Sequence, residues 1–319
     1  MAYKEENQGS KRGFNRLDPD HMGVPSYTVG TRTFALTPDH DYFEFWAGGV
    51  RFKKATAQTI VWPDTTGMYY FYFDTNGDLQ YVLNASLTEA IFLVSAICGL
   101  VYYNKTAGVA DGAKDEQHGV EGNGGMDSST HFNLHLTHGF HWAQGGLITG
   151  LADASSVYTN IGVGLHFDED IINVSALIEA TPFYYKLGAD GEWTKTANDL
   201  NIAHIASGDT YASWNEYTGG AWQLTECTNS TDYVIMMMVK FNFATDPYRK
   251  LIGTQTYASR NAARDGLANE LKAISLAGLS SSEAEFQFAW IAKRAGDLED
   301  DGSGNAYVDL RGVPINAFS

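Results

Sequence analysis

The chain has 319 residues, of which 44% are hydrophobic and 13% aromatic, so it has enough apolar material to bury the cores of two or three domains. Asp and Glu number 38 against 21 Lys and Arg, which gives a net charge of −17. Because nucleic-acid affinity depends largely on Lys and Arg that neutralise phosphates, this balance argues against a nucleic-acid partner. The hydrophobic content also argues against an intrinsically disordered protein.

The N-terminal sequence predicts neither a signal peptide nor a membrane anchor. The first residues, MAYKEENQGSKRG, contain no apolar core of a signal peptide, and residues 1–30 are polar without an apolar period. We expect a flexible arm there, or one that orders when it docks onto a partner. The longest apolar run, 90–103, is shorter than the roughly 20 residues of a membrane-spanning helix, and we interpret it as buried strands. Cys98 and Cys227 follow no metal or redox spacing, which is typical of a reducing cytoplasm.

Residues 33–83 alternate between apolar and polar side chains in short segments, which is the pattern of half-buried strands. The segment Met68–Phe73 is apolar or aromatic throughout, as in a central strand covered on both faces. Asn76-Gly77 and Gly48-Gly49 lie between such segments and favour tight hairpin turns. We therefore predict a mainly β fold with antiparallel β-sandwich or barrel-like modules.

The Gly- and Asp-rich stretch 107–129 predicts a long loop or linker and hence a domain boundary. After the arm 1–30, the chain would then divide into a β-rich domain, 31–115, and a larger β-rich domain, 116–319. Asp190-Gly191 and Gly219-Gly220 predict further hairpins within the larger domain.

One helix is expected in the larger domain, at 259–274. Ser259 can cap it, apolar residues recur at helical spacing, and Gly278 follows its end. The segment 233–243 predicts a long central strand because both of its faces are apolar. For 286–292 we prefer a strand, although a capping-box pattern before it would also allow a helix.

Four histidines, His131, His135, His138 and His141, recur at spacings of four, three and three. One helix face could present them to a transition metal, but apolar residues alternate with them, so we prefer a strand whose polar side carries the histidines. In a trimer, one histidine near the axis would become three, and His135 and His138 are the candidate ligands for that case. Our expectation remains that no metal or other cofactor is bound.

Three further patterns have both a structural and a functional interpretation. Asp168, Glu169 and Asp170 are expected to form a solvated turn, and a calcium site or acid/base pair is the alternative. Residues 297–309 resemble a calcium loop but lack its final acid, so a hairpin loop before a strand is preferred. Core packing is the default for the aromatic residues, with a carbohydrate-binding platform as the alternative. The candidate rings of that platform are Trp193, Trp214 and Trp222.

Several blocks of the sequence resemble structural proteins of tailed bacteriophage virions. The blocks are FEFWAGGVRF, YYFYFDTNGDLQY, HLTHG with GGLITG, HFDEDI, PYRKLIGTQTYASRNAAR and YVDLRG, scattered over residues 33–312. The resemblance is to components of tail fibres, baseplates and receptor-binding devices, and it brings no catalytic residue. It implies assembly and host attachment in a virion protein that is made in the host cytoplasm.

We therefore expect a non-enzymatic structural protein of the virion that forms a homo-oligomer, most simply a trimer, and contacts other tail proteins. Two alternatives remain open. One is a carbohydrate-binding module that recognises a host surface glycan. The other is a tail-spike enzyme that degrades glycans, which would need paired carboxylates across a groove. No catalytic motif in the sequence selects the enzyme.

Overall fold

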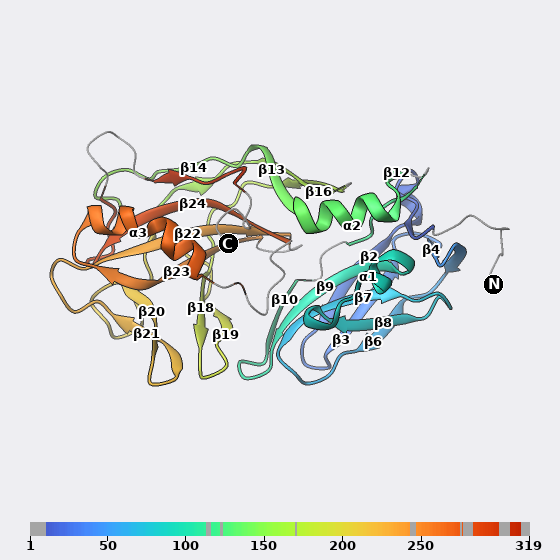
Figure 1. Cartoon of the computed structure of the whole chain (residues 1–319), viewed down its shortest axis with the longest axis horizontal. Coiled ribbons are helices and arrows are strands. Elements are labelled where there is room, and N and C mark those ends of the chain that lie inside the picture. Colours follow the sequence, from blue (N-terminus) through green and yellow to red (C-terminus); the bar gives the residue numbers. More distant parts are fainter. Residues whose placement is uncertain are drawn as a thin grey trace.

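The computed structural model describes residues 11–112, 116–121, 124–169, 171–242, 247–274, 276, 283–299 and 307–313. These residues form a mainly β protein of largely antiparallel sheets, as predicted. Figure 1 shows two β-rich halves side by side, with the N-terminal half in blue and cyan and the C-terminal half in yellow to red. No sheet among the described residues closes into a barrel. Of the two predicted alternatives, the structure is therefore closer to the β-sandwich than to the barrel-like module.

The N-terminal half contains three sheets, with strand orders β1-β4-β5, β2-β3-β6 and β10-β9-β7-β8. All their pairings are antiparallel. The strands are β1 (Gly13–Phe14), β2 (Gly23–Thr28), β3 (Thr33–Pro38), β4 (Phe43–Ala47), β5 (Val50–Lys54), β6 (Gln58–Val61), β7 (Gly67–Phe73), β8 (Leu79–Leu83), β9 (Ala96–Asn104) and β10 (Val109–Gly112). The short helices are η1 (Pro19–His21), η2 (Asn84–Ser86) and α1 (Glu89–Val94).

Aromatic side chains make the core of this half. Phe34 stacks on Phe71 with ring centroids 4.0 Å apart, and Trp62 is 0% exposed beside them. The predicted hairpin turns are confirmed, since β4 pairs with β5 and β7 with β8. Gly77 has φ +78, and a Cβ there would lie 2.4 Å from Phe52, so the turn needs glycine for both its conformation and its packing.

The C-terminal half is organised on a six-stranded sheet of order β19-β18-β23-β22-β24-β25. Within the part of this sheet that the structure describes, only β18 and β23 pair in parallel. Its strands are β18 (Phe183–Leu187), β19 (Glu192–Lys195), β22 (Tyr233–Phe241), β23 (Tyr248–Tyr257), β24 (Ala284–Lys293) and β25 (Val308–Asp309). The predicted central strand is confirmed as β22, and the strand preferred for 286–292 is confirmed as part of β24.

Smaller elements complete this half. They are β13 (Phe140–Gly145), β14 (Ile148–Thr149), β15 (Asn160–Ile161), β16 (Gly164–Asp168), β17 (Ile171–Ser175), β20 (Ser213–Thr218), β21 (Ala221–Glu226) and α3 (Arg260–Ala273). Three further elements lie beside the N-terminal half (Figure 1): β11 (Val120–Glu121), β12 (Gly124–Gly125) and α2 (Ser128–Thr137). Helix α3 confirms the predicted helix, with the Ser259 side chain accepting from the backbone N–H of Ala262. No helix among the described residues is both long and apolar enough to cross a membrane.

The run 90–103, predicted as strands, is a helix followed by a strand. Thr88 caps α1 by accepting from the N–H of Ile91, and β9 begins at Ala96. In β9 every residue is buried. The strand prediction is therefore wrong for the first part of the run, where a cap at Thr88 outweighs the apolar composition.

Residues 11–28 of the predicted arm take part in the fold. β1 pairs with β4, and β2 pairs with β3. Phe14 is 0% exposed and belongs to the aromatic core. Residues 1–10 lie outside the described residues, so the arm stays a prediction for them.

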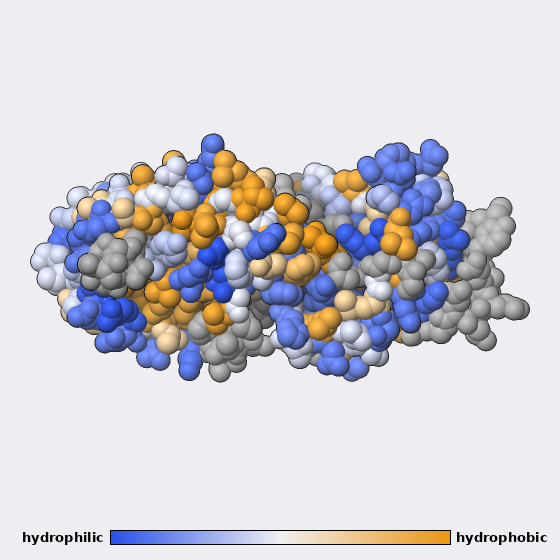
Figure 2. Space-filling model, turned by 90° about the horizontal axis from the view of Figure 1, so that it is seen from above, coloured by the Kyte–Doolittle hydropathy of each residue, from blue (hydrophilic) through white to orange (hydrophobic). Residues whose placement is uncertain are grey.

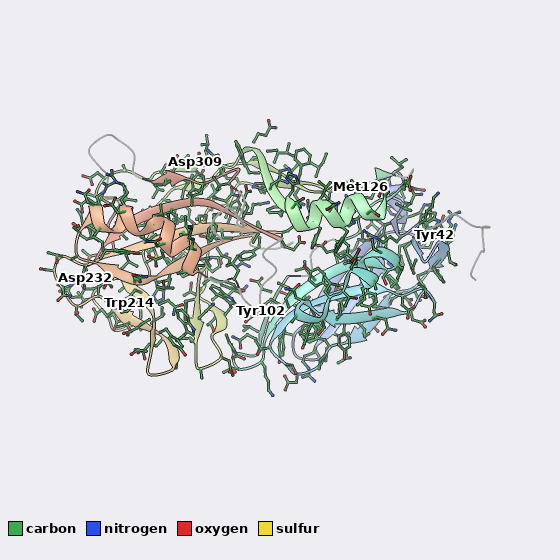
Figure 3. All side chains as sticks on the ribbon, viewed as in Figure 1. Tyr42, Tyr102, Met126, Trp214, Asp232 and Asp309 are labelled. Atoms are coloured by element: carbon green, nitrogen blue, oxygen red, sulfur yellow. The ribbon has the colours of Figure 1, made fainter. Side chains whose placement is uncertain are left out.

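The described residues form three apolar cores, and the two halves share one of them. That core combines Met68 and Tyr102 from the first half with Met237 and Leu251 from the second. Tyr102, labelled at the junction in Figure 3, accepts from the backbone N–H of Trp193 at 2.9 Å. The division into two domains stays a prediction, but the junction is a packed interface.

Candidate metal centre

Helix α2 replaces the strand predicted for the histidine segment. Both Ser129 and Thr130 donate their backbone N–H to Oδ1 of Asp127, at 3.1 and 3.0 Å, which caps the helix. The spacing of four then places His131 and His135 on one face, where they are 3% and 6% exposed. The strand prediction is wrong here because the cap and the buried histidine face outweigh the local alternation of apolar residues.

A buried segment that follows β10 brings Glu116 and His118 to the same place. Phe14 donates its N–H to the carbonyl of His118 at 2.8 Å. The Gln117 side chain donates to the carbonyl of Gly23 and accepts from its N–H, at 2.6 and 2.8 Å. These contacts attach residues 116–119, which the sequence predicted as part of a loop or linker, to the N-terminal strands.

Close backbone contact holds this segment. A Cβ at Gly125 of β12 would lie 2.0 Å from the carbonyl oxygen of Gly119, so a larger residue would push the two backbones apart. Glycines of the predicted linker therefore have a packing role in this structure.

The turn between β16 and β17 supplies two carboxylates. Asp168 ends β16 and is 0% exposed. Glu169 has φ 46, an uncommon left-handed conformation for a residue other than glycine. Adjacent residues on a strand point to opposite faces, but the turn at Glu169 lets both acids face His118. The solvated turn predicted for these two acids is thus wrong, and Asp170 lies outside the described residues.

The three histidines and four carboxylates form one buried cluster, which we call the histidine–carboxylate cluster: Glu116, His118, His131, His135, Asp168, Glu169 and Glu283. His118 Nε2 lies 3.2 Å from Glu116 Oε2, 3.7 Å from Asp168 Oδ2 and 3.6 Å from Glu169 Oε2. His131 Nε2 lies 3.6 Å from the same Glu169 oxygen. His135 Nδ1 lies 3.3 Å from Glu169 Oε1 and 3.5 Å from Glu283 Oε1.

Phe92 and Arg12 border the cluster. The Phe92 ring of α1 lies 5.1 Å from the ring of His131 and 4.7 Å from that of His135. The Arg12 guanidinium lies over the Phe92 ring, 5.2 Å from its centroid. Its Nη2 lies 2.5 Å from His131 Nδ1. Burial and the neighbouring Asp168 raise the pKa of Glu169, while His135 and His118 act to lower it.

This donor set suits a transition metal. Imidazole nitrogens combined with carboxylate oxygens bind zinc, iron and similar divalent ions, whereas calcium and magnesium prefer oxygen ligands alone. Two triads within the cluster have ligand atoms that all lie within 4.8 Å of one another: His118, His131 and Glu169, and Glu116, His118 and Asp168. The ligands are buried, and closed sites of this kind are typically structural.

Of the two predicted metal ligands, His135 and His138, the structure places one in the cluster and one outside it. His135 belongs to the cluster, whereas His138 follows α2 as its C-cap and is exposed. His141 lies on β13, with its ring 6.4 Å from that of His138. The pair His135 and His138 is therefore not brought together around one site, and His118 and His131 take the place of His138.

The three tryptophans of the predicted platform do not form one exposed surface. Trp193 is 5% exposed and stacks on Tyr184 at 5.5 Å. Trp214 packs against a separate apolar core in the C-terminal half (Figure 3). Trp222 is half-buried on β21, where its ring lies 5.2 Å from that of Tyr217. Core packing thus accounts for Trp193 and Trp214.

Sequence reasoning did not identify Glu116, His118 or Glu283 as site residues. For Glu116 and His118, the sequence signal was an acid and a histidine two positions apart. It lies within a glycine-rich stretch, and the glycines favoured a loop. The calcium-like loop before Tyr307 lies largely outside the described residues, and β25 pairs with β24 beyond it.

The chain was compared with known protein families, curated proteins and solved structures, and none of them matches it. The fold and the site nevertheless define a class. The chain is a mainly antiparallel β protein in which a buried histidine–carboxylate cluster connects distant segments.

Proposed function

We propose that the chain is a structural component of a bacteriophage virion, in the fibre, baseplate or adsorption apparatus of the tail. The observation that carries the proposal is where the resembling blocks lie. FEFWAGGVRF makes the β4–β5 hairpin, YYFYFDTNGDLQY makes β7 and β8, and PYRKLIGTQTYASRNAAR makes β23 and the start of α3. These are hairpins and central strands of the packed framework, so the resemblance concerns architecture.

A test of this proposal is the location of the protein in phage particles. We expect it to co-purify with density-banded virions at a fixed copy number per particle, and gold-labelled antibody to mark the tail. A lysate protein that separates completely from intact particles would contradict the proposal. Gold confined to the head would contradict the tail assignment.

Self-association is part of the proposal, and the β16–β17 hairpin is the surface that supports it. On this hairpin the usual pattern is inverted: His166 and Asp168 are 0% exposed, whereas Ile172 and Val174 are 61% and 68% exposed. The surface on the side of β13, β14 and β16 carries a broad apolar area (Figure 2). β17 is also an edge strand, and exposed apolar edges of this kind are usually covered.

A second copy of this chain is the proposed occupant of that surface. With a net charge of −17, two copies repel each other over most of their surface, so an uncharged apolar strip is where they can approach. A closed trimer built in this way would multiply weak contacts to a receptor, which can raise avidity about 10²–10⁴-fold.

Charge placed on this strip is expected to separate the copies. The double substitution Ile172→Lys and Val174→Glu should convert the oligomer into a monomer, because each exposed apolar side chain becomes a charge that must stay solvated. Light scattering coupled to size-exclusion chromatography measures the mass. The matched control is Val24→Lys on β2, which is 49% exposed in the other half and should leave the oligomer intact. A monomeric parent protein would disprove self-association.

A glycan-binding role is the second candidate, and one observation favours it. Tyr217 is 59% exposed beside Trp222 on the β20–β21 hairpin, and exposed aromatic pairs suit the apolar faces of sugars. A glycan array with the parent protein and with Tyr217→Ala tests this role, since binding at the hairpin requires the ring.

A further inference from the structure

We propose that the histidine–carboxylate cluster is a metal centre for one divalent transition ion, with His118 Nε2, His131 Nε2 and the Glu169 carboxylate as ligands. Glu116 and Asp168 complete the coordination, and His135 orients Glu169 from its other oxygen. This inference rests on the geometry of the cluster and is independent of the virion proposal.

The separations of the ligand atoms carry the first step. Two donor atoms bound to one ion at about 2.0–2.2 Å lie about 3.0–3.6 Å from each other. Of the four separations that involve His118 Nε2 or His131 Nε2, three lie between 3.2 and 3.6 Å, and the fourth, from His118 Nε2 to Asp168 Oδ2, is 3.7 Å. Charge-assisted hydrogen bonds between the same groups would be about 2.7–2.9 Å long. The contact of His118 Nε2 with Glu116 is within hydrogen-bond range, but the three separations to Asp168 and Glu169 are longer than hydrogen bonds and are close to the spacing of ligands around one ion.

Glu169 gives the second step. Its side chain is 0% exposed, and neither of its carboxylate oxygens has a hydrogen bond of good geometry among the described residues. Its backbone is held at φ 46, a sparsely populated conformation that tends to occur at functional sites. A strained residue that points a buried carboxylate between three imidazoles is well explained as a ligand.

Charge gives the third step. The cluster buries four carboxylates, and the Arg12 guanidinium contacts it at His131. Buried carboxylates are stabilised by positive charge that lies close to them. A divalent cation would compensate two further charges at the centre of the cluster.

The contact of Arg12 separates this proposal from a metal-free network. A guanidinium can only donate, so His131 Nδ1 accepts from Arg12, and the proton of a neutral ring then lies on Nε2, toward Glu169. An ion bound at His131 Nε2 requires the ring proton to be on Nδ1, and this proton would then point at the Arg12 guanidinium. Arg12 and the ion thus compete for the ring, and Arg12→Gln, whose oxygen can accept from Nδ1, should keep or raise metal occupancy. In a metal-free network the same substitution would only remove an interaction.

The experiment uses the full-length protein without an affinity tag, grown with added zinc, iron, manganese and cobalt. Mass spectrometry of the metals should find about one ion per chain, and a chelator should lower the melting temperature by several degrees, since the ion binds the folded state. His118→Ala and the isosteric Glu169→Gln should each reduce occupancy at least about tenfold, and the chelator should then have no effect.

His138→Ala is the matched control, because His138 is exposed at the end of the same helix. It should keep the metal. If a variant does not fold, cobalt titration of the parent protein is decisive: absorption bands of a nitrogen- and oxygen-liganded ion at a one-to-one ratio support the centre. The proposal is overturned if the parent holds no stoichiometric metal and gives no such bands. It is also overturned if Glu169→Gln binds the ion as well as the parent, or if His138→Ala loses it.

Discussion

Replacing Arg249 by methionine is expected to lower the free energy of unfolding by about 3–5 kcal/mol. Arg249 lies on β23 and is 0% exposed, and its Nε donates to Oδ2 of Asp111 at 3.1 Å. Asp111 lies on β10 in the other half and is 2% exposed. Methionine keeps most of the length but removes the charge, so a buried carboxylate loses its main partner. Chemical denaturation followed by tryptophan fluorescence measures the change.

Two further proteins decide whether that loss comes from the buried charge. The double variant Arg249→Met with Asp111→Leu should recover most of the stability, because both charges leave the interior together. Lys293→Met is the surface control: its Nζ lies 3.7 Å from Asp297 at 35% exposure, so the change should stay within about 1 kcal/mol. A double variant as unstable as the single one would show that packing, and not the buried charge, explains the loss.

The elements that could be predicted are those with local signals. Asn76-Gly77 defines its hairpin through backbone conformations that are available within four residues, and Ser259 caps a helix whose apolar period is complete in the sequence. The segment 11–28 has no such signal, because β1 and β2 gain their stability from pairing with β4 and β3. Helix α2 was missed for a different reason: one capping acid, Asp127, and buried histidines decided between two periods that both fitted.

The candidate site could be predicted only in part, because it joins residues that are distant in the chain. The spacing of four between His131 and His135 indicated that one helix face could carry both, but the sequence did not predict that they are buried. Glu116 and His118 lie in a glycine-rich stretch that is typical of loops, and the tight backbone contacts of those glycines exist only in the folded chain. The acids that end the β16–β17 hairpin predicted a solvated turn, but its polar residues His166 and Asp168 are buried.

A second buried cation, Lys250 on β23, has a predictable effect on the pH dependence of stability. Its Nζ donates to Asp199 Oδ1 at 2.7 Å and to the carbonyl of Asn201 at 2.6 Å, and it lies 4.0 Å from the centroid of the Phe183 ring. Burial lowers the pKa of Lys250 from 10.5 to about 8, against the attraction of Asp199. His204 is a further titratable group nearby: burial lowers its pKa, and Lys250 acts in the same direction.

The sign of the effect follows from which state holds the proton. Between pH 8 and 10.5 the unfolded chain keeps a proton on Lys250 that the folded chain has released. The free energy of unfolding therefore rises with pH in this window, by up to about 1.4 kcal/mol per pH unit. This contribution of Lys250 is fully present above pH 10.5, the pKa in the unfolded chain. It is lost as the pH falls through about 8, the pKa in the folded chain. Above about pH 9 to 10, buried groups whose pKa values are raised, such as Cys227 and Tyr158, oppose it.

Comparison with Lys250→Met isolates this contribution, because the opposing groups are common to both proteins. The stability difference between the parent and Lys250→Met should increase in favour of the parent by about 2–3 kcal/mol between pH about 8 and about 10. Denaturation midpoints at a series of pH values measure it. For Lys293→Met, whose lysine is 35% exposed, the difference should stay nearly flat over the same range. A flat or shrinking difference for Lys250→Met would mean that Lys250 keeps its proton in the folded chain, held by Asp199 and the carbonyl oxygens around it.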